Sequence, residues 1–275
     1  MIALLPVLLT AWLSWGAWSL GERPVERSYL GFDLNEYPGD DALPVLRKTF
    51  AFSSYWLSPP PGLKSTTWLG KRAALQAQGF GFLVLYNGRL IRELQSVADG
   101  KQKGTSDGRN AVQLARKEGF PAGAVIFLDI EEGGRMPVAY HEYVKAWIDA
   151  LADANFRAGA YCSGMPVSEG GGVTIITAND LLNHLEGRKL VLFVFNDACP
   201  PSPGCVFPQA PPAVSRCGVV GAAVWQYAQC PRRKQYTAHC AATYAADGNC
   251  YAPGDSAHKW FLDADAADSP NPSAP

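Results

Sequence analysis

The chain has 275 residues, with 24 basic against 25 acidic side chains and a formal net charge of −1. A charge so close to zero excludes a protein that holds nucleic acid or an anionic membrane through a basic surface. Hydrophobic residues make up 48% of the chain and aromatic residues 11%, enough for a packed core, which excludes a wholly disordered protein.

The N-terminal segment has the pattern of a secretory signal. An apolar run covers residues 2–13, and the small-x-small sequence Ala17-Trp18-Ser19 follows it just before a charged stretch. We therefore predict a signal peptide over residues 1–19 that is removed near Ser19. The alternative is an uncleaved anchor, but the run is shorter than the roughly 20 residues a span needs. With the signal removed, the chain is expected to be secreted or periplasmic, and export implies an oxidising compartment.

Short apolar runs then alternate with segments of helical periodicity. Strands are predicted at residues 29–34, 49–56, 81–86, 124–130, 157–162, 190–196, 219–227 and 259–262, and helices at 66–78, 106–118, 137–154 and 178–186. Strands that are apolar through their middles fit a parallel sheet covered by helices. No phosphate-binding glycine loop follows the first strand, because Gly31-Phe32-Asp33-Leu34 lacks the G-x-G-x-x-G spacing. This pattern favours an α/β (β/α)₈ TIM-type barrel over residues 28–265 rather than an open doubly wound sheet.

The alternation changes after residue 196. Segments 197–218 and 229–254 are rich in Pro and Cys and take the place of the helices expected between the late strands, so we predict that both are disulfide-rich insertions. Cys162 ends a predicted buried strand and is expected to be a free thiol. The other six cysteines are expected to form three disulfides, with fifteen connectivities open: Cys199, Cys205, Cys217, Cys230, Cys240 and Cys250. Residues 266–275 are predicted to be a disordered tail.

Carboxylates follow the strands that the barrel would bring to one mouth. Asp129 and Glu131 are two residues apart on a strand, so their side chains point to the same side. Two neighbouring carboxylates cannot both ionise without cost, so one of them has a raised pKa and can act as a proton donor. We predict that Glu131 is a general acid, that Asp129 orients it, and that Asp33 on the first strand supplies a second carboxylate.

Aromatic and amide side chains end several of the same strands. We expect them to contact a sugar substrate: Trp56, Tyr86, Tyr161, Asn196, Trp225, Gln226 and Tyr227. None of the four histidines follows a predicted strand, which argues against a zinc or iron site, and no metal or cofactor is predicted. An all-carboxylate Mg²⁺ site at Asp33, Asp129 and Glu131 stays open as an alternative.

These residues also carry a family resemblance. Gly31-Phe32-Asp33, Phe127-Leu128-Asp129-Ile130-Glu131 and Val224-Trp225-Gln226-Tyr227 resemble the motifs of family 25 glycoside hydrolases, the Chalaropsis-type lysozymes. The order of segments, and Gly119-Phe120-Pro121 before the fourth strand, is more similar to the bacterial glycoside-hydrolase-like domain of unknown function 1906. The resemblance implies a barrel that cleaves cell-wall glycan with Glu131 as the acid. The chain departs from the lysozyme pattern where an acidic residue usually follows Trp-Gln-Tyr, and where Asp263-Ala264-Asp265 replaces Asp-x-Asn.

The leading functional hypothesis is therefore an exported hydrolase of peptidoglycan or another N-acetylated polysaccharide. Its partner would be cell-wall glycan, with no nucleic acid and no stable membrane insertion after signal removal, and the chain is expected to be a monomer. The first alternative is a non-catalytic glycan-binding or cell-envelope module on the same barrel. The second alternative is a metal-dependent phosphodiesterase.

Overall fold

The computed structural model describes residues 27–197, 211–229, 251–257, 259, 260 and 262–275. The predicted signal peptide lies outside these residues. So do most of both Cys-rich insertions and five of the cysteines expected in disulfides, Cys199, Cys205, Cys230, Cys240 and Cys250.

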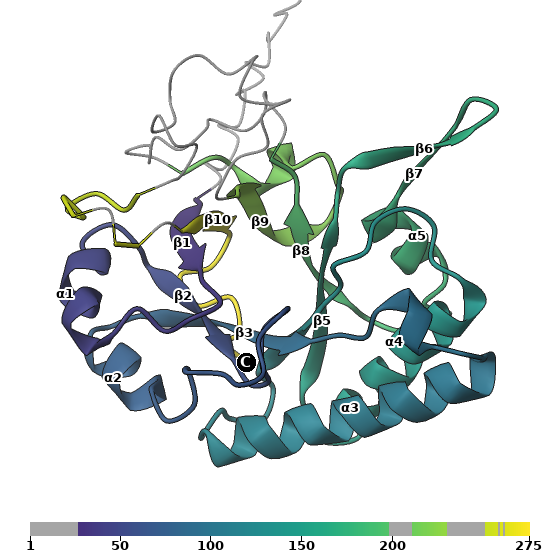
Figure 1. The fold of residues 1–275 in the computed structure, drawn as a ribbon, viewed down its shortest axis with the longest axis horizontal. Coiled ribbons are helices and arrows are strands. Elements are labelled where there is room, and N and C mark those ends of the chain that lie inside the picture. Colours follow the sequence, from purple (N-terminus) through teal and green to yellow (C-terminus); the bar gives the residue numbers. More distant parts are fainter. Residues whose placement is uncertain (1–26, 198–210, 230–250, 258, 261) are drawn as a thin grey trace, which may run out of the picture.

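Eight strands close into a barrel in the order β1-β10-β9-β8-β5-β4-β3-β2 (Figure 1). Their bounds are β1 Tyr29–Asp33, β2 Phe52–Trp56, β3 Gly81–Asn87, β4 Val125–Asp129, β5 Arg157–Ser163, β8 Val191–Phe195, β9 Ala222–Ala228 and β10 Asp263–Ala267. The strands from β1 through β9 pair in parallel around the ring. The predicted eight-stranded α/β barrel is confirmed.

The last strand differs from the prediction in position and direction. It lies at Asp263–Ala267 instead of 259–262, and it runs antiparallel to both β1 and β9. Its sequence, Asp-Ala-Asp-Ala-Ala, has little of the β-branched and aromatic character that marks strands. Because the strand is reversed, its first residue, Asp263, pairs with Asp33 at the end of β1. An acidic strand start therefore lies at the barrel mouth.

The helices differ in length from their predictions. The structure has α1 Leu43–Leu46, α2 Arg72–Ala77, α3 Val97–Lys117, α4 Val138–Ala152 and α5 Thr177–Asn183, with 3-10 turns η1 Asp40–Ala42, η2 Ile91–Glu93 and η3 Val214–Arg216. Helix α3 begins nine residues before the predicted helix, with Ser96 as its N-cap accepting a hydrogen bond from the amide of Asp99. Between β8 and β9 the described residues contain η3, and residues 198–210 of the first predicted insertion lie outside them.

Helix α3 is long because its glycines contact helix α4 directly. A Cβ atom added at Gly100 or Gly104 would stand 2.2 or 2.1 Å from a carbonyl oxygen of α4, and one at Gly108 would stand 2.7 Å from Ala150 Cβ. Glycine is a poor helix former by itself, but here its missing side chain lets the two backbones approach. Figure 1 shows the two helices lying together along the outside of the barrel.

The C-terminal residues are ordered, so the predicted disordered tail over residues 266–275 is wrong. Ala266 and Ala267 belong to β10, and the chain continues across the N-terminal ends of β3 and β4. There the amides of Phe82 and Val84 donate to the side chains of Asn271 and Ser273 at 2.8 and 2.9 Å. These strands pair with each other only from Leu85 onward, so the tail supplies the hydrogen bonds that their beginnings would otherwise lack.

A hairpin that the sequence did not predict projects from the ring of strands (Figure 1). It consists of β6 Pro166–Gly170 and β7 Val173–Ile176, inserted between β5 and α5. Among the described residues no helix combines the length and the apolar character needed to cross a membrane.

Candidate active site

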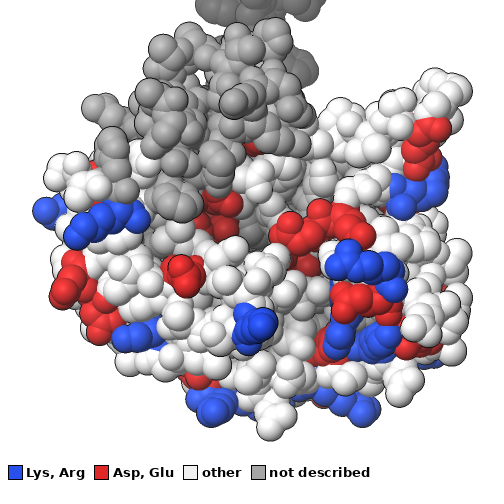
Figure 2. Space-filling model, viewed as in Figure 1, with Lys and Arg blue, Asp and Glu red and all other residues white. Residues whose placement is uncertain are grey.

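A cavity of about 220 Å³ opens at the C-terminal ends of the parallel strands. It lies at the end of the barrel where such folds carry chemistry. None of its described lining residues is basic, and Figure 2 shows acidic side chains bordering the hollow in the middle of the face shown, with Lys and Arg farther out. The described lining residues are Asp33, Asn35, Trp56, Pro61, Leu85, Asp129, Glu131, Tyr161, Phe193, Gln226, Gln229 and Asp263.

Asp129 and Glu131 form the first pair of acids in this cavity. Asp129 is 4% exposed, whereas Glu131, just beyond the end of β4, has an exposed side chain at the rim. Burial raises the pKa of Asp129 well above its ordinary value, and the charges of Glu131 and Asp33 raise it further. Partial removal from water also raises the pKa of Glu131, while its hydrogen bond with Asp129 lowers it. The two directions are those expected when Asp129 is the proton donor of the pair and Glu131 the acceptor.

Asp33 and Asp265 form a second pair of the same kind. Asp265 is completely buried, and neither of its carboxyl oxygens has a protein hydrogen-bond donor among the described residues. Burial raises its pKa well above the ordinary value, with the charges of Asp33 and Asp263 adding to the effect. Its interaction with Asp33 raises the pKa of Asp265 further and lowers that of Asp33. This pair had not been predicted, although the alternation Asp263-Ala264-Asp265 has the period that points both acids to one side of a strand.

Gln226 hydrogen-bonds to Asp33 and influences its pKa. Its Nε2 donates to Asp33 Oδ2 at 2.7 Å, and its Oε1 accepts from the hydroxyl of Tyr161 at 2.8 Å. Burial raises the pKa of Asp33 to about 6; the Gln226 hydrogen bond lowers it, the charge of Glu131 raises it and the Asp265 hydrogen bond lowers it. With a pKa of about 6, Asp33 is mostly ionised at neutral pH, whereas burial raises the pKa of Asp129 and of Asp265 well above the ordinary value. The mouth thus combines a carboxylate with an exposed carboxyl group that can deliver a proton.

Six of the predicted site residues meet at this cavity. They are the three acids, Asp33, Asp129 and Glu131, together with Trp56, Tyr161 and Gln226. Trp56 is held in place because its ring nitrogen donates to the carbonyl of Leu34 at 3.0 Å. Asn35 and Asp263 also line the cavity and were not among the predicted site residues.

Four predicted sugar contacts lie elsewhere. Tyr86 packs against Trp147 of α4, with ring centroids 5.3 Å apart, and accepts a hydrogen bond from Asn110. Trp225 and Tyr227 flank Gln226 on β9, so the alternation of the strand turns both rings away from the side that faces the cavity. Asn196 makes hydrogen bonds within the fold. Its side-chain Nδ2 donates to the backbone carbonyl of Cys217 at 2.8 Å, and its backbone carbonyl accepts from Trp225 Nε1 at 2.9 Å.

The cysteines require one correction. Cys162 is a buried free thiol, as predicted, and burial raises its pKa to about 12. Cys217, which was expected in a disulfide, is also a buried free thiol, and its sulfur contacts the backbone of Val219 at 3.4 Å. It directly follows η3 and is packed in the core.

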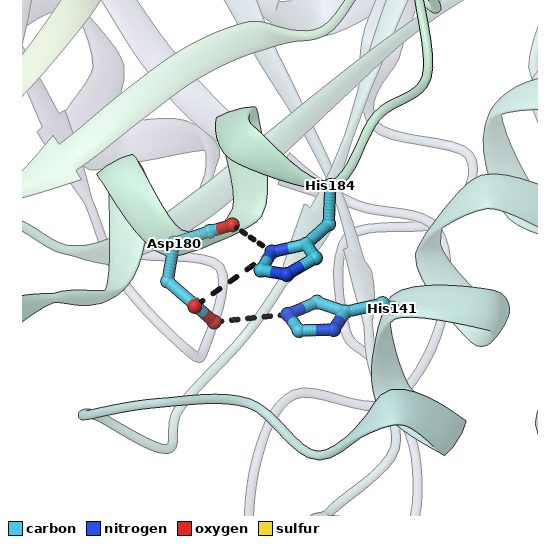
Figure 3. Close-up of side chains that lie close together, drawn as sticks. All are labelled: His141, Asp180 and His184. Carbon is cyan, nitrogen blue, oxygen red and sulfur yellow. Dashed lines mark hydrogen bonds and ion pairs between the residues drawn. The ribbon is translucent and has the colours of Figure 1, made fainter.

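A second polar cluster lies outside the mouth (Figure 3). Among the described residues, His141, Asp180 and His184 are the one group of His, Cys, Asp or Glu side chains whose ligand atoms lie within 4.8 Å of one another. The two imidazole rings are stacked, 3.8 Å apart and inclined by 13°. A metal ion lies in the plane of each imidazole that binds it, and parallel stacked rings cannot both meet this condition. The arrangement is that of a hydrogen-bonded cluster. The three carboxylates proposed for Mg²⁺ do not form such a group.

Comparisons with known proteins agree with the barrel. Residues 65–193 match the family described as Rv2525c-like, glycoside hydrolase-like domain, and this confirms the predicted resemblance. No curated protein matches the chain. An uncharacterised B. stearothermophilus protein is similar over 73% of this chain and 90% of its own, at 22% identity and a TM-score of 0.53.

Two further structures belong to enzymes. The Clostridium perfringens spore cortex lytic enzyme SleM is similar over 88% of this chain and 68% of its own, at 13% identity and a TM-score of 0.50. A family GH25 lysozyme from Aspergillus fumigatus is similar over 90% of this chain and 100% of its own, at 12% identity and a TM-score of 0.45. The glycoside-hydrolase-like match over residues 65–193 therefore lies within a closed eight-stranded barrel.

Proposed function

We propose that this chain is an exported hydrolase of peptidoglycan or another N-acetylated polysaccharide, with Glu131 as its general acid. The observation that carries the proposal is the pairing of acids at the mouth: a carboxylate, Asp33, faces the same cavity as an exposed carboxyl group, Glu131. Glycosidases use such a pair, one acid protonated and the other ionised. Export rests on the signal-like residues 1–19.

In the proposed reaction, Glu131 gives a proton to the glycosidic oxygen, and the bond from this oxygen to the anomeric carbon breaks. Asp129, buried behind Glu131, supplies the shared proton and orients the acid. Asp33 stabilises the positive charge that develops on the sugar, or orients its acetamido group for attack on the anomeric carbon. A water molecule completes the hydrolysis and returns a proton to the Asp129–Glu131 pair. Gln226 donates a hydrogen bond to Asp33, and Tyr161 orients the Gln226 amide. Trp56 lines the cavity, where its ring would contact the sugar.

The comparisons support the substrate class. The matching family is named for its likeness to glycoside hydrolases, and SleM, whose fold is similar, is described as a spore cortex lytic enzyme. Both point to glycan of the bacterial envelope as the polymer to test first.

The decisive experiment measures the clearing of purified cell walls by wild type and by Glu131→Gln. Gln keeps the shape of the side chain but cannot donate the acid proton, so clearing should fall by at least about a hundredfold. Glu186→Gln is the matched control, because Glu186 is an exposed glutamate that pairs with Lys145 on the outside of the barrel. Undiminished clearing by a folded Glu131→Gln variant would refute the assignment.

The non-catalytic alternative makes a different prediction for the same samples. It is favoured by the size of the cavity, about 220 Å³, below the roughly 300–1,000 Å³ of most ligand pockets. A protein of this kind would sediment with insoluble cell walls and release no reducing sugar. Glu131→Gln would then leave sedimentation with the walls unchanged.

A further inference from the structure

The position of Glu131 depends on the segment that follows it. Strand β4 ends at Asp129, and Ile130 makes the next backbone hydrogen bond, from its amide to Tyr161 O at 3.0 Å. Glu131 therefore stands beyond the paired strand, and residues 132–136 after it contain two consecutive glycines. A short glycine-containing loop would leave an exposed catalytic side chain mobile unless other residues hold the loop.

Helix α5 holds this loop with two side chains. The hydroxyl of Thr177 accepts from the amide of Gly134 at 2.8 Å and donates to its carbonyl at 3.1 Å. Oδ2 of Asp180 accepts from the amide of Met136 at 2.9 Å. Thr177 and Asp180 are three residues apart, so they lie on one face of the helix and hydrogen-bond to nearby residues of the loop. All of these hydrogen bonds are buried.

Asp180 is itself fixed from several sides (Figure 3). Its side chain is 2% exposed, and His141 Nε2 of α4 lies 2.9 Å from Oδ2. His184 Nδ1, one turn along α5, hydrogen-bonds to the backbone carbonyl of Asp180 at 2.7 Å, and its ring stacks on that of His141. Arg135, in the loop, reaches Oδ1 at 4.0 Å and pairs with Glu169 of the hairpin at 3.0 Å. A carboxylate held in this way cannot move without breaking several hydrogen bonds, which makes it a rigid anchor.

We propose that Asp180 is a positioning residue for Glu131: through Met136 it fixes the loop that presents the acid to the cavity, with Thr177 as its partner and His141 as its support. The assignment rests on the proposed function only in naming Glu131 as the acid. The mechanical link, from helix α5 to the loop after β4, stands on the hydrogen bonds alone.

The test measures amide hydrogen exchange and the Glu131 side-chain ¹³C resonance in Asp180→Leu. Leu removes the acceptor of the Met136 amide, so this amide should exchange about tenfold faster or more, while the Ile130 amide keeps its wild-type rate. The Glu131 resonance should shift. Asp180→Asn keeps an acceptor for Met136 and should restore both readouts. The control variant is Asp149→Asn, which removes the ion pair between Asp149 of α4 and Arg188. It should change neither the amide exchange rates nor the Glu131 resonance. If Asp180→Leu does not fold, Thr177→Val takes its place, with Gly134 as the reporting amide.

Wall-clearing kinetics add a readout that general destabilisation would not mimic. Asp180→Leu should lower kcat about tenfold, leave KM within about twofold, and recover in Asp180→Asn. Unchanged exchange at Met136 in the folded variant overturns the proposal, as does faster exchange with an unmoved Glu131 resonance. If the wild type clears no walls while both spectroscopic readouts move as expected, the proposed function fails and the positioning role of Asp180 stands.

Discussion

The side-chain amide of Gln226 donates a 2.7 Å hydrogen bond to Asp33, which lies 193 positions earlier in the chain. The bond joins β9 to β1 across the mouth, although the antiparallel strand β10 separates these two strands in the sheet. Tyr161 determines which end of the amide faces Asp33, because its hydroxyl donates to Gln226 Oε1. One amide therefore links an aromatic side chain of the cavity wall to the ionised carboxylate.

Replacing Gln226 should change the titration of Asp33. The Gln226 hydrogen bond lowers the pKa of Asp33, which is about 6 in its presence. In Gln226→Leu the pKa should therefore rise above 6, and the acid limb of wall clearing should move to higher pH. The direct measurement is the pH titration of the Asp33 side-chain ¹³C resonance. Tyr161→Phe removes only the group that orients the amide, so its effect should be smaller. An Asp33 pKa that stays in place or falls in Gln226→Leu would contradict this reading.

Asp33 should also impose a pH dependence on stability. Its pKa is about 6 in the folded protein against 3.8 as the reference, so the native state binds more protons than the unfolded state between these values. The free energy of unfolding contributed by this group is therefore highest below pH 4, falls as pH rises from about 4 to 6, and stays lower above. The full difference corresponds to roughly 3 kcal/mol.

Asp33→Asn removes this titration and should raise the free energy of unfolding at pH 7, by at most the same roughly 3 kcal/mol. Urea unfolding between pH 4 and 8 measures the effect, and Asp153→Asn, at an exposed position, is the matched control. A variant that is less stable than wild type at pH 7 would show that the hydrogen bonds of Asp33 outweigh its desolvation.

Because burial raises the pKa of Asp265 well above its ordinary value, we expect a neutral carboxyl group that donates to Asp33, and this makes its amide analogue informative. Asn cannot ionise, yet its N–H can donate to Asp33 as a protonated carboxyl group does. Asp265→Asn should therefore leave the pKa of Asp33 near 6 and should increase stability most at alkaline pH, where wild type is driven to ionise a buried acid. Asp265→Leu lacks the donor and should raise the pKa of Asp33. Loss of stability at pH 8 in the Asn variant would argue that Asp265 is charged in the fold.

The sequence identified the barrel because its strands are apolar through their middles and alternate with segments of helical periodicity. Reading strand ends also located the three acids, because parallel strands bring their C-terminal ends together whatever the loops do. The errors at the mouth came from side-chain direction. Trp225, Gln226 and Tyr227 are consecutive, and a strand can turn only the middle residue, or only its two neighbours, into the cavity.

The last strand and the C-terminal tail could not be read from local pattern. Strand β10 is stabilised by pairing with β1 on one side and β9 on the other. Its buried acid, Asp265, interacts with Asp33 at the barrel mouth. The tail, rich in Asp, Pro and Ser, resembles a disordered segment in composition. It is ordered by bonds to strand beginnings nearly two hundred residues away, such as the 2.9 Å bond from Val84 N to Ser273 Oγ. Long-range pairing of this kind leaves no periodic signal in the sequence.

Helix α3 shows the same limit and yields a final prediction. Gly104 lowers the intrinsic helix propensity of its segment, yet its Cα packs so closely on α4 that an added Cβ would stand 2.1 Å from Tyr143 O. Gly104→Ala gains about 1 kcal/mol of helix propensity but forces the helices apart, and overpacking typically costs about 1–3 kcal/mol. Because the clash involves backbone that cannot rotate away, we expect a net loss of stability in urea unfolding. Ser106→Ala, on the exposed face of the same helix, should be neutral or slightly stabilising. A more stable Gly104→Ala would mean that α3 and α4 are less closely packed than the structure shows.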